Sequence, residues 1–155
     1  MINKIREWYL KTYKTINFEH KDADDNILYT ETFRYTRKGK ETRAAYKYAV
    51  GELGNFLHIK TQNIRANTPK QDGYVTWSAK RRRRNGTSKS VNINAHREIN
   101  RMFNGWSWPW KRFVHHINGT KNDNRAVNLI AVSGKEHAAL HCGKAKIVNR
   151  KVVYL

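Results

Sequence analysis

The sequence predicts an α+β protein in which a β-hairpin and a helix precede a unit of two short strands and one helix. Three observations support this prediction. Asn85-Gly86 separates two segments of alternating hydrophobicity, which is the strongest short signal for a β-hairpin. Residues 112–116 and 128–132 are short apolar runs on either side of a polar loop. Ser133 then opens the sequence SGKE, the Ser-x-x-Glu pattern that begins a helix.

Charge is the strongest bulk property of the chain. It has 155 residues, in which 31 Lys and Arg stand against 12 Asp and Glu, for a formal net charge of +19. Such an excess attracts a polyanion, because cations that neutralise phosphates release condensed counterions. We therefore expect DNA or RNA as the partner; the alternative is a basic protein without a specific partner. A membrane surface is disfavoured, since no long basic amphipathic helix is predicted.

The remaining composition narrows the class of protein. The hydrophobic fraction is 39%, with five Trp, eight Tyr and five Phe, which is typical of a folded chain. No apolar run is long enough to span a membrane, and the first residues lack the apolar core of a signal peptide. The single cysteine, Cys142, excludes an internal disulfide framework and a cysteine zinc site. We therefore expect a cytoplasmic protein.

The sequence of residues 1–70 predicts a basic α/β region, which is expected to contact DNA or to have an accessory role. Its first helix is expected over residues 2–16, where apolar residues recur three and four positions apart. These residues are Ile5, Trp8, Tyr9, Tyr13 and Ile16. The turn-prone sequence KDADDN follows, and residues 27–36 then alternate in the manner of a strand.

Two further helices are expected in this region, one over residues 41–53 and a short one through Ile59 and Ile64. Two helices joined by a Gly-containing turn can place the second helix in a major groove. The alternative, an ordinary helical pair packed on the sheet, is at least as well supported.

The polar stretch at residues 67–72 is the boundary with a second domain, residues 71–155, which opens with the predicted hairpin. Its strands carry the alternating apolar residues Val75, Trp77 and Ala79, and then Val91, Ile93 and Ala95. The hairpin is also strongly basic: the first strand ends in Lys80, Arg81, Arg82, Arg83 and Arg84. In a protein of charge +19, this run favours phosphate contacts over a merely solvated tip. With Arg125 in a later loop, these are the candidate DNA-binding residues.

A helix is predicted after the hairpin. Its apolar face consists of Ala95, Ile99, Met102 and Phe103. Asn94 is placed as its N-cap, and Gly105 lies just past its end. The sequence WSWPWKRF follows, with three Trp in five residues. These rings either cover the core from a loop or stack on nucleotide bases.

Four of the seven histidines lie close together in the last part of the sequence. The predicted strand 112–116 ends in His115-His116, and His137 and His141 lie four apart on one face of the predicted helix. A strand pair closing on that helix brings His115 beside the other two, so three imidazoles can hold one metal ion. Adjacent strand residues point to opposite faces, so His116 is left for a separate role.

These residues resemble the HNH nucleases, whose ββα-metal module carries a His at the end of its first strand, an Asn before the second and a His or Asn on the helix. The matching residues are His116, Asn128 and His137, at spacings of twelve and nine. The resemblance covers residues 72–141. It includes a Gly-Tyr strand and a helix that opens with His96-Arg97, as in phage-encoded HNH homing endonucleases.

The resemblance implies a role for each residue. His116 corresponds to the general base, and His115, His137 and His141 correspond to metal ligands. Asn128 corresponds to a brace whose side chain ties the loop across the motif and holds His116 in place. His96 is interpreted as structural. Homing enzymes of this kind commonly have Asp where His115 stands and Asn where His137 stands. Three imidazoles suit Zn, Ni or Mn better than an oxygen-rich site would, although Mg stays among the candidates for the single divalent ion.

The sequence therefore predicts a metal-dependent endonuclease that hydrolyses double-stranded DNA, leaving a 5′-phosphate and a 3′-hydroxyl. The family implies a phage homing or free-standing enzyme, active in the host cytoplasm. Three alternatives stay open: a nucleic-acid-binding protein with a structural His metal site, a basic RNA-binding protein, and a sequence-tolerant restriction or packaging nuclease.

Overall fold

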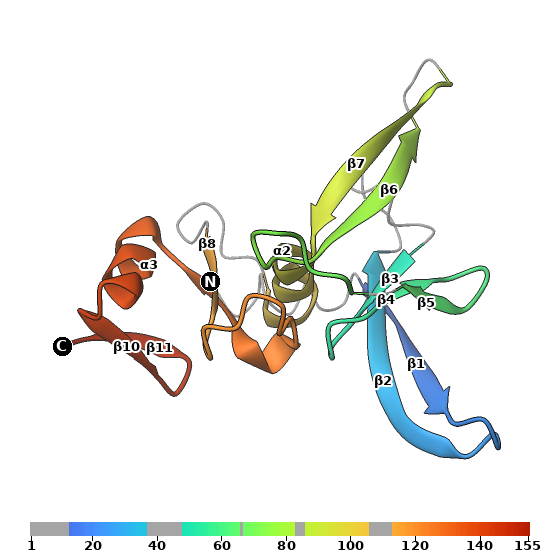
Figure 1. The fold of residues 1–155 in the computed structure, drawn as a ribbon, viewed down its shortest axis with the longest axis horizontal. Helices are drawn as coiled ribbons and strands as arrows, with labels where there is room; N and C mark the ends of the chain where they lie inside the picture. Colours follow the sequence, from blue (N-terminus) through green and yellow to red (C-terminus); the bar gives the residue numbers. More distant parts are fainter. Residues whose placement is uncertain (1–12, 37–47, 66, 83–85, 106–112) are drawn as a thin grey trace.

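The computed structural model describes residues 13–36, 48–65, 67–82, 86–105 and 113–155 (Figure 1). Strands predominate among the elements, and the helices are short, so the expected mixture of α and β structure is confirmed. No helix in the described ranges has the length and apolar character needed to cross a membrane. The sequence WSWPWKR at residues 106–112 lies outside the described residues.

A five-stranded antiparallel sheet forms the N-terminal part, with its strands in chain order. They are β1 (Tyr13–Lys21), β2 (Ile27–Thr36), β3 (Tyr48–Gly51), β4 (Phe56–His58) and β5 (Asn63–Arg65). Strand β2 has the bounds that its alternation predicts. The sequence KDADDN forms the turn before it, where the Asp22 carboxylate accepts the backbone N–H groups of Asp24 and Asn26, each at 2.9 Å.

The prediction of a helix over residues 2–16 is wrong for residues 13–16, because these residues belong to β1. Ile16 pairs with Phe33 of β2, and Ile16 and Phe18 pack against the buried Phe33. The alternation of these two apolar residues, together with pairing to a neighbouring strand, outweighs the helical spacing of the residues before them. Residues 2–12 lie outside the described part of the chain.

The helices expected over residues 41–53 and through Ile59 and Ile64 are also wrong among the described residues. Residues 48–51 form β3, Ile64 lies in β5, and Ile59 lies in the turn that precedes it. Strand β3 pairs with strands on both sides, and three of its four residues are buried. A strand covered on both faces has a continuous apolar run, which periodicity cannot distinguish from a buried helix. The helix-turn-helix interpretation requires both helices, so it is wrong as well.

The predicted hairpin and helix are confirmed. Strands β6 (Thr76–Arg82) and β7 (Ser88–Asn94) pair antiparallel on either side of Asn85-Gly86, with Trp77 opposite Ile93. The helix α2 (Ala95–Ile99) follows directly and continues as a wider π-helical turn, Asn100–Asn104. Gly105 ends it with a φ of +81°, which glycine adopts without strain. Asn94 is at the N-cap position, but its side chain makes no capping hydrogen bond.

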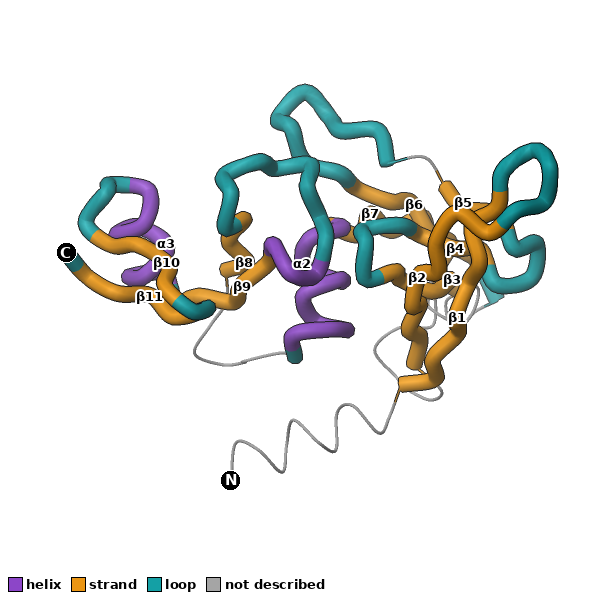
Figure 2. The backbone as a smooth tube through the Cα atoms, turned by 90° about the horizontal axis from the view of Figure 1, so that it is seen from below, coloured by secondary structure: helices purple, strands orange, loops and turns teal. Residues whose placement is uncertain are grey.

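The C-terminal part contains two antiparallel strand pairs around one helix. In order, these are β8 (Phe113–His116), a single 3₁₀ turn (Ala126–Asn128), β9 (Leu129–Val132), α3 (Gly134–His141), β10 (Ala145–Val148) and β11 (Lys151–Tyr154). Figures 1 and 2 both place α2 between the β8–β9 pair and the five-stranded sheet. The hairpin β6–β7 projects away from this centre (Figure 1).

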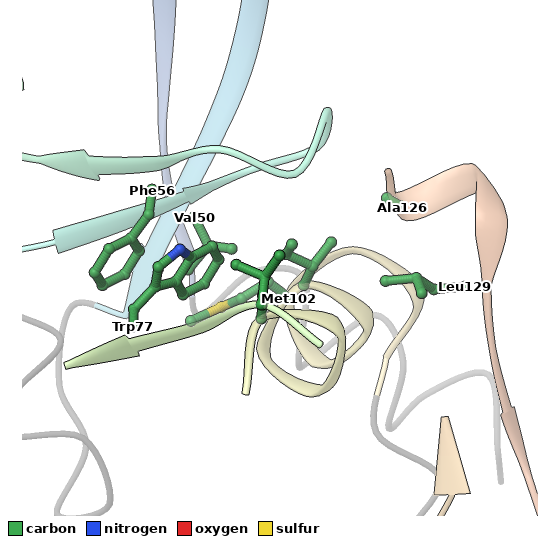
Figure 3. Close-up of a cluster of buried hydrophobic side chains, with 9 residues drawn as sticks. Val50, Phe56, Trp77, Met102, Ala126 and Leu129 are labelled. Atoms are coloured by element: carbon green, nitrogen blue, oxygen red, sulfur yellow. The ribbon is translucent and has the colours of Figure 1, made fainter. Parts of the chain in front are cut away.

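One hydrophobic core connects these parts (Figure 3). It contains Val50 and Phe56 from the sheet, Val75 and Trp77 from the hairpin region, Ala95, Ile99 and Met102 from the helical segment after the hairpin, Ala126 from the 3₁₀ turn and Leu129 from β9. The rings of Phe56 and Trp77 stack with centroids 4.1 Å apart and planes 3° from parallel. The N-terminal sheet and the C-terminal elements therefore bury their apolar side chains in a common core.

Candidate functional site

The helix α3 is fixed by the capping box that the sequence predicts. The backbone N–H of Glu136 donates to Ser133 Oγ at 3.2 Å, and the backbone N–H of Ser133 donates to Glu136 Oε2 at 2.7 Å. This pair sets the first residue of the helix as Gly134. His137 and His141 therefore lie one turn apart, on the same face.

Three imidazoles converge where β8 meets this face. One ring nitrogen each from His115, His137 and His141 lies within 4.8 Å of the other two. The Nε2 atoms of His137 and His141 are 3.3 Å apart. Nitrogen ligands of a tetrahedral zinc ion, each about 2.0–2.1 Å from the metal, are separated by about 3.3 Å. The donor type and the spacing of these groups therefore fit a divalent metal ion.

The surroundings favour the metal-binding form of His115 and His137. Burial lowers the pKa of His115, and repulsion from His141 and His137 lowers that pKa further. Burial and the neighbouring His141 lower the pKa of His137 as well. Phe113 stacks on the His137 ring, with centroids 5.0 Å apart, and limits its orientation. Neutral rings carry the free lone pair that coordination needs.

His116 faces the other side of β8, as the alternation of strand residues predicts. It is only 5% exposed, and its ring lies 5.4 Å from that of His96 and 6.1 Å from that of Tyr74. Burial lowers the pKa of His116, although the contact with Asn124 acts in the opposite direction. The structure therefore separates the two adjacent histidines: His115 belongs to the cluster, and His116 does not.

Asn124 defines which nitrogen of His116 is basic. The Asn124 amide nitrogen donates to the carbonyl oxygen of Asn122 at 3.4 Å, which orients the amide oxygen toward His116. Its Oδ1 lies 3.1 Å from His116 Nε2 and can only accept. Nε2 therefore carries the hydrogen, and Nδ1 of the neutral ring carries the lone pair. Asn124 was not predicted as a site residue, because nothing in the polar sequence NDNR distinguishes it from its neighbours.

Asn128 ties together the loop between β8 and β9. Its side-chain nitrogen donates to Asn118 Oδ1 at 2.9 Å and to the Asp123 carbonyl at 2.8 Å, and its Oδ1 accepts from the Asn118 N–H at 3.0 Å. These bonds tie the two ends of the loop together. They hold in place the segment that carries Asn124, so Asn128 acts on His116 through the loop.

Side chains from two other segments fix the beginning of β9. The Asn104 amide donates to the carbonyls of Ala126 and Leu129, both at 2.9 Å. The Arg150 guanidinium, from the turn between β10 and β11, donates to the carbonyls of Val127 at 2.9 Å and Leu129 at 2.7 Å. The strand that pairs with His115 and His116 is thus anchored to the helix α2 region and to the last hairpin.

His96 lies beside His116 with one polar atom unused. Its Nδ1 is buried and has no hydrogen-bond partner within the described ranges. Burial, then repulsion from His116 and Arg97, lowers the pKa of His96 to about 4. The ring therefore stays neutral at physiological pH and packs between Tyr74 and His116.

The candidate DNA-binding residues are less fully described. Strand β6 ends at Arg82, and the side chains of residues 80–84 lie outside the described part of the structure. Arg125 is exposed and forms a bidentate pair with Asp123, with Nε to Oδ1 at 2.8 Å and the terminal nitrogen to Oδ2 at 2.7 Å. This pairing lowers the pKa of Asp123 to about 2 and offsets part of the positive charge.

Comparisons with known proteins agree with this geometry. Residues 94–139 match the family model described as HNH endonuclease, so the predicted resemblance is confirmed. A solved structure of the HNH homing endonuclease I-HmuI, described as DNA binding and cleavage, shares the fold with a TM-score of 0.52 and 23% identity. The alignment covers 66% of this chain and 56% of that chain, so this protein matches little more than half of the length of I-HmuI in that structure. No curated protein matched the sequence.

Replacing either helical histidine should weaken metal binding. His137→Ala or His141→Ala removes one of three converging imidazoles, and we expect the affinity for zinc or manganese to fall by more than about tenfold. Isothermal titration of the purified proteins measures it. His58→Ala, which removes a histidine that bonds to Thr61 instead, is the control. Equal affinity in the wild type and both variants would contradict the assignment.

Replacing His96 with Gln should flatten the pH dependence of stability between about pH 6.5 and 4. Because its pKa is lowered in the folded protein, the unfolded chain binds more protons in this range, and the free energy of unfolding decreases as the pH falls. After a discount for partial exposure, this contribution is about 2 kcal/mol. Chemical denaturation across this range measures it. The same pH dependence in wild type and variant would show that His96 is not held neutral.

Proposed function

We propose that this protein is a metal-dependent endonuclease that hydrolyses phosphodiester bonds in double-stranded DNA. The observation that carries the proposal is the convergence of His115, His137 and His141 on one side of β8, with His116 on the other side. Separate places for a metal ion and a base are what a ββα-metal nuclease requires. The HNH match over residues 94–139 supports the same assignment.

In the proposed mechanism, His116 Nδ1 takes a proton from the attacking water. The oxygen of that water forms a bond to phosphorus, and the bond from phosphorus to the 3′ oxygen breaks. The products are a 5′-phosphate and, after protonation from solvent, a 3′-hydroxyl. Asn124 keeps the ring in the tautomer that can accept the proton. His115, His137 and His141 would hold a divalent ion, which would supply Lewis acidity for the phosphate.

The proposed partner follows from charge. A net charge of +19 favours binding to the phosphate backbone, and the basic end of β6 lies on the projecting hairpin. Residues 71–155 form the proposed nuclease domain. Residues 1–70 contact DNA or support that domain, with which they share a core. From the resemblance of residues 72–141 to phage-encoded HNH homing endonucleases, the proposed enzyme is a phage homing or free-standing endonuclease that acts in the host cytoplasm.

Plasmid cleavage with His115 and His116 variants tests this division of roles. Wild-type protein with zinc, manganese, nickel or magnesium should convert supercoiled plasmid to nicked or linear DNA, and a chelator should prevent it. His116→Ala should retain metal and DNA binding but cleave about a hundredfold to ten-thousandfold more slowly, the usual share of a general base. His115→Ala should lose metal affinity together with activity. Wild-type cleavage by His116→Ala, or loss of its metal, would refute the proposed roles.

DNA affinity should depend strongly on salt. If roughly six to ten phosphates are contacted, the affinity for duplex DNA falls about a thousandfold or more between roughly 50 and 200 mM salt. Replacing Arg81, Arg82, Arg83 and Arg84 with Ala should reduce that slope. Fluorescence anisotropy with a labelled duplex measures both proteins, and Lys151→Ala, in β11, is a single-charge control. An unchanged slope in the quadruple variant would place the DNA contacts elsewhere.

A further inference from the structure

The turn between β3 and β4, residues 51–55, lies against the loop that carries Asn124. The backbone N–H of Ala126 donates to the Glu52 carbonyl at 2.7 Å. Gly54 has a φ of +101°, and a Cβ placed on it would lie 3.3 Å from the Asn124 carbonyl carbon and 3.4 Å from the Asn124 Cβ. The close approach of the two backbones therefore depends on glycine at this position.

A buried carboxyl group holds the turn from within the sheet. Glu31 of β2 is fully buried. Its Oε1 accepts the backbone N–H of Leu53 at 3.1 Å, and its Oε2 accepts the Asn55 amide at 2.6 Å and His20 Nε2 at 3.0 Å. Three donors point at two oxygens that only accept, so another side chain would leave some of these buried donors without partners.

The turn is also tied to the central core from its other side. The Asn67 amide donates to the Gly54 carbonyl at 2.9 Å and to Asn55 Oδ1 at 3.2 Å, while Asn67 Oδ1 accepts from Trp77 Nε1 at 3.1 Å. Trp77 is 3% exposed and stacks on Phe56. The position of the turn is therefore defined by two buried networks.

We propose that the turn 51–55, held by Glu31, is a positioning element for His116 and acts through Asn124. The proposal rests on the proposed role of His116 as the base. It gives the N-terminal sheet a part in the chemistry besides any contact with DNA, since the sheet defines where the Asn124 amide oxygen lies. Glu31 is a positioning residue in this scheme, two steps removed from the reacting atoms.

The hydrogen bond between Asn124 and His116 is sensitive to distance, so a shift of the turn 51–55 should have a measurable effect on His116. The hydrogen bond between His116 Nε2 and Asn124 Oδ1 is already 3.1 Å long, and a shift of the loop would weaken it. With that bond weakened, Asn124 adds less to the preference of the ring for the tautomer with a free Nδ1. A misplacement of about 1 Å at a catalytic group costs up to about a hundredfold in rate.

Glu31→Gln tests the proposal with little change in volume. The Gln amide presents an NH₂ group to donors that need an acceptor, so the turn loses at least one hydrogen bond. The control is Ile64→Ala, which weakens packing in the same sheet against Phe33, Ala49 and Leu57 without touching the turn. Nitrogen NMR of the His116 imidazole reports the tautomer, and denaturation curves match the two variants for stability.

We expect Glu31→Gln to lower the Nε2–H population of His116 and to slow plasmid cleavage about tenfold to a hundredfold, with metal affinity unchanged. Ile64→Ala should change neither the tautomer nor the rate. In the Asn124→Ala background, Glu31→Gln should have no further effect on rate, because Asn124→Ala already removes the hydrogen bond to His116.

Two results would overturn the proposal. One is a wild-type His116 tautomer in Glu31→Gln. The other is a rate loss that adds in full to that of Asn124→Ala. Because the NMR readout needs no catalysis, a wild-type protein that fails to cleave DNA would refute the proposed function and leave the positioning test intact.

Discussion

The pairing of β8 with β9 is the constraint on which the rest of the site depends. Because successive residues of a strand point to opposite faces, this short pair sends His115 toward α3 and His116 toward His96 and Asn124. A shift of the register by one residue would exchange the two histidines. The pairing is held by Asn104 and Arg150, which bind the carbonyls at the start of β9.

The core determines how these elements face each other. Trp77 and Phe56 join the hairpin to the N-terminal sheet, and Leu129, fully buried, joins β9 to the same cluster. A smaller cluster of Phe33, Ala49 and Leu57 lies within the N-terminal sheet itself, so this sheet contributes to the shared core and also has a core of its own. Removal of the sheet would expose one side of the cluster that supports the site.

Polar side chains fix the conformation of the loop between β8 and β9. The loop between β8 and β9 has little apolar surface, and its form depends on Asn118, Asp123 and Asn128, whose side chains bond to one another and to the backbone. Such networks fix positions well only when every member has a partner. The turn 51–55 provides a further partner for this loop. The Glu52 carbonyl accepts the backbone N–H of Ala126, and Gly54 lies close to the backbone of Asn124.

The sequence by itself determined the elements whose signals are local. The Ser133 capping box, the hairpin around Asn85-Gly86, the alternation of β2 and the four-residue spacing of His137 and His141 depend on neighbouring residues alone, so they were predictable. Only the tertiary structure decided the N-terminal region, where pairing of each strand with the next in one sheet placed β1, β3 and β5 where helices were expected. It alone also chose Asn124 over the other polar residues of its loop as the partner of His116. That choice depends on contacts between segments far apart in the chain, which no local pattern records.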